Sequence, residues 1–212
     1  MARGRGHSPL LFLLLLIVVV LAVFGVMCGL SVSRIQDHMN KADADYQSFN
    51  SELEAGQYDE AMASLEGLSS EWKAVDAEMS AWYWQAARYV PVLGEDVGSM
   101  QSMASIAKRL ANDGVLPVAT DAKGIFDGLD GTITLDVLTQ KATQIGQFIK
   151  TLDTCRGVVS QCNHEAQALP EGHLGFVNDC RKQIVDQASQ IDEAYESIDA
   201  LLDLANLAGL TG

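Results

Sequence analysis

The sequence predicts an all-α protein in which an N-terminal transmembrane helix continues into an extracytoplasmic antiparallel helical bundle with long, coiled-coil-like helices. Three observations support this fold class. Residues 10–32 carry no charge, apolar residues elsewhere recur at steps of three and four, and no segment alternates long enough to make a stable strand. The 212 residues suit an anchor and one domain of ordinary size, so no second large domain is expected.

Residues 10–32, LLFLLLLIVVVLAVFGVMCGLSV, are expected to cross the membrane. At about 1.5 Å per residue, a helix of this length reaches about 35 Å, enough to span the hydrocarbon core of a bilayer. A cleaved signal peptide is the alternative because Arg3 and Arg5 precede the run, although the usual signal core is only about 7–15 residues long. Cys28 follows Met27 rather than Gly or Ala, so we interpret it as a buried apolar residue and not as a lipid-attachment site.

The distribution of charge predicts the topology and excludes some partners. Arg3 and Arg5, in the basic flank 1–9, should keep the N-terminus in the cytoplasm. Two of the 14 basic residues precede the span and all 28 acidic residues follow it, which leaves residues 33–212 with 12 basic residues and a formal net charge of −16. This acidic part is expected outside the cytoplasm, and nucleic acids and anionic lipid headgroups are poor partners for it.

Apolar spacing and helix-breaking residues divide the exported part into six helices, the first of which continues the membrane helix. Gly56 separates the first two, Pro91 and Gly94 end the second, and Gly114 is expected to stop the third. LPEGH at 169–173 supplies the turn between the last two. The expected helices are 33–55, 57–89, 95–113, 117–126, 135–169 and 174–207.

Aromatic residues concentrate beside the Pro–Gly break. Trp72, Trp82 and Tyr89 fall on the same helical stripe as Val75 and Met79. Because that stripe is the apolar face of the expected second helix, core packing is the role predicted for these three aromatic residues.

The remaining aromatic residues of this stretch point away from the stripe. Trp84 shares a helical face with Arg88, and Tyr83 lies beside it. The residues that could form an exposed contact surface are therefore Tyr83, Trp84 and Arg88.

Three cysteines follow the span, at positions 155, 162 and 180. In an antiparallel hairpin centred on Glu171, Cys162 would face Cys180, so a disulfide joining the last two helices is geometrically reasonable in an oxidising compartment. The alternative is that all three cysteines are reduced core residues, since each lies on an apolar stripe.

Metal binding and catalysis receive little support. Cys162, His164, His173 and Cys180 converge on one hairpin end, but their spacing matches no common zinc site. The acids of the 127–136 connection, Asp127, Asp130 and Asp136, do not fit the calcium-binding EF-hand pattern and are interpreted as solvated turn residues. No nucleophile motif, phosphate-binding loop or dinucleotide fingerprint occurs, so we expect no catalytic residues, no cofactor and no enzyme activity.

Four motifs occur in order behind the apolar run: LEAGQYDEA at 53–61, Trp82 with PVLGED at 91–96, SMASIAKRLAND at 102–113, and DGTITLDVLTQ at 130–140. With them, residues 41–140 resemble the N-terminal helical region of an uncharacterised actinobacterial family of single-pass, membrane-anchored envelope proteins, sometimes labelled chemotaxis proteins. The resemblance implies an all-helical region behind one membrane anchor. Relatives usually continue into a larger mixed domain with an Arg–Gly-Gly signature, which this sequence is expected to lack.

Two functional hypotheses follow. The first is a non-enzymatic, membrane-anchored envelope scaffold, whose partner is another envelope protein or a second copy of the chain. The second is an extracytoplasmic sensor that binds a small ligand between its helices near Trp82, similar to the ligand-sensing bundle of chemoreceptors but without their signalling domain.

Overall fold

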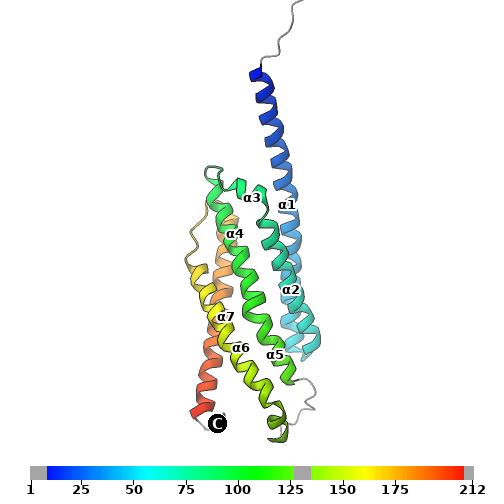
Figure 1. Cartoon of the computed structure of the whole chain (residues 1–212), viewed down its shortest axis with the longest axis vertical. Coiled ribbons are helices and arrows are strands. Elements are labelled where there is room, and N and C mark those ends of the chain that lie inside the picture. Colours follow the sequence, from blue (N-terminus) through cyan, green and yellow to red (C-terminus); the bar gives the residue numbers. More distant parts are fainter. Residues whose placement is uncertain (1–8, 127–134, 208–212) are drawn as a thin grey trace, which may run out of the picture.

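The computed structural model describes residues 9–126 and 135–207, and all the secondary structure in these residues is helical (Figure 1). The expected all-α fold is confirmed. Within these ranges the side chains of residues 9–18, 21, 126, 135–140 and 199–207 are not described. The elements are α1 (Pro9–Glu54), α2 (Tyr58–Met79), α3 (Trp82–Ala87), α4 (Leu93–Arg109), a π-helical segment (Leu110–Val115), α5 (Leu116–Phe126), α6 (Leu135–Gln167) and α7 (Gly175–Leu207).

The expected helical hairpin around Gly56 is present. α1 is uninterrupted to Glu54, and its second half lies side by side with α2 (Figure 1). Gly56 has a φ of +71°, a left-handed conformation that glycine adopts without steric cost. Across the hairpin, His38 Nδ1 lies 2.5 Å from Glu71 Oε2. This contact and the turn at Gly56 fix the register of α2 along α1.

The first half of α1 extends beyond the other helices (Figure 1). Among the residues described with side chains, no helix is long and apolar enough to cross a bilayer. Residues 10–18 of the expected span lie outside that set, so the span over 10–32 stays a prediction. In this half of the helix Phe24, Met27 and Cys28 are partly buried against the bundle. Other apolar side chains are exposed: Val19, Val20, Val23, Val26 and Leu30.

The expected continuous helix 57–89 is wrong, because the chain breaks before the aromatic stretch. α2 ends at Met79, Ala81 has an extended backbone (φ −61°, ψ 150°), and α3 begins at Trp82. The Ser80 hydroxyl donates to Asp76 O at 2.8 Å, a local bond that competes with helix continuation. The freed carbonyl of Met79 accepts a hydrogen bond from the Gln101 side chain at 2.8 Å.

The sequence predicted that Gly114 stops a helix, and this prediction is wrong. α4 continues through the π-helical segment into α5. A Cβ at Gly114 would lie 2.9 Å from Val159 Cγ2 on α6, and the carbonyl of Gly114 accepts a hydrogen bond from the Tyr195 hydroxyl on α7. The glycine thus permits close packing of this segment against the last two helices. π-Helical turns of this kind commonly mark a local irregularity in a longer helix.

The last two helices agree with the expected ranges, but their register does not. Asn163 on α6 bonds to Asp192 and Ser189 on α7, at 2.7 and 3.1 Å. The Arg181 side chain donates to Leu169 O at 2.7 Å. In a hairpin centred on Glu171, Asn163 would lie opposite residue 179. Its partners on α7 lie roughly three helical turns further along the chain. The 168–174 connection is irregular, which makes the turn asymmetric.

The core consists of two clusters. One lies where the π-helical segment, α6 and α7 meet and contains Val159, Cys162 and Ala188 at 0% exposure. The other joins α1 to α2, α3 and α4 around Met79. Trp72 is partly buried and packs against both clusters, as the sequence stripe predicted for this residue. The space between the two clusters is the main candidate for a binding site.

Candidate functional site

A groove of about 490 Å³ lies between the two core clusters. Residues of α1 and α2 line it together with residues of α4, the π-helical segment and α7. Its volume falls within the range of about 300–1,000 Å³ that is usual for small-molecule sites. The groove is formed because α7 packs on α4 and α6 while α1 packs on α2, so α1 and α7 do not close on each other.

The lining of the groove is mostly apolar and rich in methionine. Trp72 and four methionine side chains contribute to it. Methionine is flexible and polarisable, so such a surface adapts to apolar ligands of different shapes. The methionines are Met39, Met79, Met100 and Met103.

The polar side chains that line the groove are mostly amides, with one carboxylate and the phenol of Tyr46. Gln183, Gln187 and Gln190 come from one face of α7, and Asn40 and Asp43 come from α1. None of the described residues that line the groove is basic. An amide can both donate and accept hydrogen bonds, so this lining suits an uncharged or cationic polar group and disfavours an anion.

A hollow that adjoins the groove is also acidic. This hollow shares the three glutamines with the groove and adds Asp179, Asp186 and Lys182 on α7. Two carboxylates against one ammonium group give this hollow a net negative charge.

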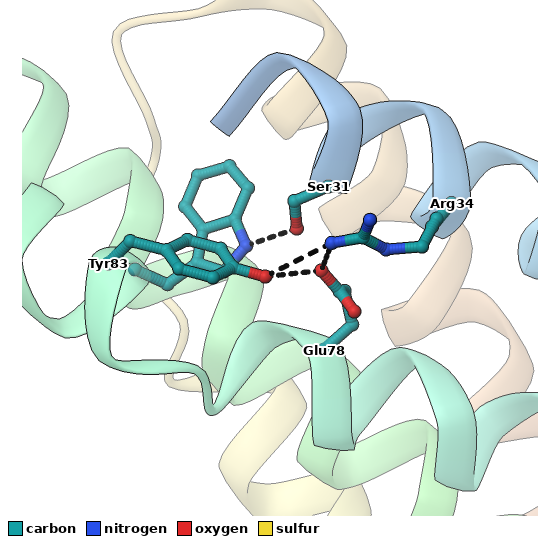
Figure 2. A network of polar contacts seen from close by, with 5 residues as sticks. Ser31, Arg34, Glu78 and Tyr83 are labelled. Atoms are coloured by element: carbon teal, nitrogen blue, oxygen red, sulfur yellow. Dashed lines mark hydrogen bonds and ion pairs between the residues drawn. The ribbon is translucent and has the colours of Figure 1, made fainter. Parts of the chain in front are cut away.

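A polar joint fixes the aromatic stretch to α1 at one end of the bundle (Figure 2). Arg34 donates to Glu78 Oε1 at 2.6 Å and lies 3.4 Å from the Tyr83 hydroxyl, which in turn donates to Glu78. Trp84 Nε1 donates to the buried hydroxyl of Ser31 at 2.7 Å. The Arg34 hydrogen bond, with smaller contributions from Ser31 and Tyr83, lowers the pKa of Glu78 to about 2.

The expected exposed surface is wrong in its aromatic members. Tyr83 and Trp84 are buried, at 6% and 7% exposure, while Trp82 and Tyr89, expected in the core, are exposed at 64% and 89%. Arg88 is exposed, as expected. The break at Ser80 and Ala81 is the physical reason, because it restarts the helix and rotates every following side chain relative to the α2 stripe.

The expected disulfide is also wrong. Cys162 and Cys180 are free thiols, as are the other two cysteines. Asn163, the neighbour of Cys162, bonds to Ser189 and Asp192, which lie 9 and 12 residues beyond Cys180 on α7. Cys162 is fully buried, and desolvation raises its pKa to about 11. Cys180 lines the groove instead.

The zinc hypothesis is not supported, since no three His, Cys, Asp or Glu residues within the described part of the chain are placed to hold a metal. His173 instead lies beside Asp96, at the start of α4. Its backbone N–H donates to Asp96 Oδ1 at 2.7 Å, and a Cβ at Gly172 would lie 2.2 Å from the same oxygen. Asp96 therefore fastens the 168–174 connection to α4.

Several expectations fall outside the residues that the structure describes. Arg3 and Arg5 lie in residues 1–8, and Asp127 and Asp130 lie in residues 127–134. The side chain of Asp136 is likewise not described. The cytoplasmic N-terminus and the interpretation of the acids as solvated turn residues therefore stay predictions.

Comparisons with known proteins give no match: no protein family, no curated protein and no solved structure is significantly similar to this chain.

Proposed function

We propose that this protein is a non-enzymatic, single-pass membrane protein whose extracytoplasmic helical bundle binds a small apolar molecule in the groove between α1, α2, α4 and α7. This proposal is the second of the two hypotheses from the sequence, that of a sensor or ligand-binding module. The ligand is now placed beside Trp72 and not near Trp82. The observation that supports it is the groove itself, which is large, lined by methionines and placed between two core clusters.

The chemistry of the lining indicates the class of ligand. An apolar body would contact Trp72 and the methionines, while Gln183, Gln187 and Gln190 would meet an uncharged or cationic polar group. The adjoining acidic hollow, with Asp179 and Asp186, favours the approach of a cation and repels an anion. A neutral amphiphile or an organic ammonium ion is the ligand class proposed.

Membrane anchoring is supported by the first half of α1. This half projects past the bundle (Figure 1), and several of its apolar side chains, among them Val19, Val23 and Val26, are at least half exposed. A row of exposed valines in water is unfavourable, whereas lipid is a suitable environment for it. The basic flank with Arg3 and Arg5 supports a cytoplasmic N-terminus.

Binding of N-phenyl-1-naphthylamine, a neutral apolar fluorophore, tests the ligand proposal. When the fluorophore is titrated into the full chain in amphipol, its fluorescence should increase and reach saturation. Ala107→Phe places a ring in the groove lining and should reduce the signal to background, whereas Ala77→Phe, which adds the same ring at an exposed position of α2, should leave it unchanged. Equal fluorescence from all three folded proteins would reject the groove as the site.

The scaffold hypothesis keeps one specific observation in its favour. Leu53 and Tyr58, on either side of the α1–α2 turn, are 41% and 61% exposed. They offer an apolar contact at the end of the bundle opposite α3 (Figure 1). If the chain is a scaffold, Tyr58→Ser should abolish recovery of its envelope partner, while ligand binding in the groove should be unaffected.

A further inference from the structure

The corner between α3 and α4 carries a concentration of exposed apolar side chains. Trp82 and Tyr89 are 64% and 89% exposed, and Val92 and Leu93 follow at 62% and 45%. We call these four residues the apolar corner. Exposed apolar side chains scattered singly are common in soluble proteins. These four, together with Val90 at 37% exposure, lie within twelve residues around one turn and form a patch.

The position of this corner is fixed relative to α1. The neighbour of Trp82, Tyr83, belongs to the joint with Arg34, and Trp84 bonds to Ser31. Ser31 is the second-last residue of the apolar run 10–32. The corner therefore lies beside the end of that run, at the level where α1 leaves the bundle (Figure 1).

The shape of the corner is held by its backbone. Val92 has a φ of +72°, a left-handed conformation that is unusual for a β-branched residue. Gly94 allows the turn to close on Arg88, since a Cβ there would lie 2.0 Å from the Arg88 carbonyl oxygen. The Trp82 ring rests edge-on against Tyr83, with centroids 5.8 Å apart. The exposed side chains are thus presented by a fixed turn.

We propose that the apolar corner inserts into the interfacial layer of the bilayer that α1 enters, so that the bundle rests on the membrane surface at this end. Tryptophan and tyrosine are the side chains enriched at that depth, because each has an apolar ring and a polar group. The inference rests on the membrane anchoring proposed above and is independent of the groove.

The contact is apolar and does not depend on anionic lipid. Glu95, whose side chain is 78% exposed, lies two residues after Leu93, and its charge offsets that of the exposed Arg88. A protein surface without net positive charge gains little from negatively charged headgroups. Neutral phosphatidylcholine should therefore suffice.

Quenching of tryptophan fluorescence by brominated phosphatidylcholine tests the proposal on the full chain in vesicles. Brominated lipids should quench part of the wild-type emission. Trp82→Phe should lose at least half of the fractional quenching, whereas Trp72→Phe should increase it, because that variant removes an emitter shielded in the bundle. Circular dichroism should confirm that both variants are folded.

The possible results of this experiment distinguish insertion of the apolar corner from membrane anchoring through α1. A chain that fails to float with vesicles overturns both, since no membrane end then exists. A chain that floats while Trp82→Phe is quenched to the same fraction as wild type keeps the anchor and overturns the apolar corner. Quenching that appears only when anionic lipid is added also contradicts the proposal, because the contact would then be electrostatic.

Discussion

Trp84 Nε1 donates a 2.7 Å hydrogen bond to Ser31 Oγ, and both side chains are buried although 53 residues separate them in sequence. This bond fastens the short helix α3 to α1 at the end of the apolar run. Six residues of helix cannot be stable alone, so α3 owes its position to such tertiary contacts.

Trp84→Phe should destabilise the protein by about 1–3 kcal/mol, because it leaves the buried Ser31 hydroxyl without its donor. Ser31→Ala should cost a similar amount by leaving the indole N–H unpaired. Chemical denaturation of both single variants and the double variant gives the coupling between them. Strict additivity of the two effects would show that the hydrogen bond contributes nothing.

The Glu78 joint should make stability sensitive to acid. The Arg34 hydrogen bond holds the folded pKa of Glu78 at about 2, below its usual 4.5. Because the folded value is the lower one, the stabilisation is complete above about pH 5 and is lost as the pH falls through about 2. Arg34 is half exposed, so solvent screening keeps this contribution small.

Thermal unfolding of wild type and Glu78→Gln measures this effect. The difference between the two proteins should shrink by more than half from pH 7 to pH 3. Arg34→Gln should behave like Glu78→Gln, since either change removes the ion pair. A difference that stays constant with pH would contradict the assignment.

Gly94→Ala should destabilise the α3–α4 corner by about 2–3 kcal/mol, because its Cβ would meet a backbone oxygen that cannot move independently. Gly98→Ala is the matched control in the same helix. Its Cβ would lie 3.8 Å from the Arg88 guanidinium, so the alanine should be neutral or should stabilise the helix by up to about 1 kcal/mol. Denaturant midpoints distinguish the two, and equal effects would contradict the close approach at Gly94.

The thiols should differ in reactivity. Burial raises the pKa of Cys155, Cys162 and Cys180, but only Cys180 is partly exposed among them. With N-ethylmaleimide at pH 8, peptide mass spectrometry should find Cys180 modified first and Cys162 last. A non-reduced peptide pair joining Cys162 to Cys180 would show that the α6–α7 register is different from the one described.

The long helices were predictable because each carries an unbroken stripe of apolar residues. α6 and α7 begin and end close to the expected positions, and Gly56 marked its turn through a conformation that few other residues adopt. The prediction that Gly114 ends a helix was wrong. A glycine that permits close packing, here against Val159, cannot be distinguished in sequence from one that ends a helix.

The break at Ser80 and Ala81 carries no glycine or proline, so the periodicity continues through it unchanged. That single local event reversed the roles of Trp82 and Trp84. The groove was hidden for another reason. Gln183, Gln187 and Gln190 are indistinguishable in sequence from a solvated helix face, and only the separation of α1 from α7 turns them into a lining.

Protection of Cys180 is the most direct measurement of the proposed binding site. Cys180 lies in the groove lining, so an occupied groove should shield it. The rate of its modification by N-ethylmaleimide in the full chain should fall several-fold when N-phenyl-1-naphthylamine saturates the protein, and Ala107→Phe should show no such protection. An unchanged rate at Cys180, while the fluorophore is bound, would place the ligand elsewhere and contradict the proposed function.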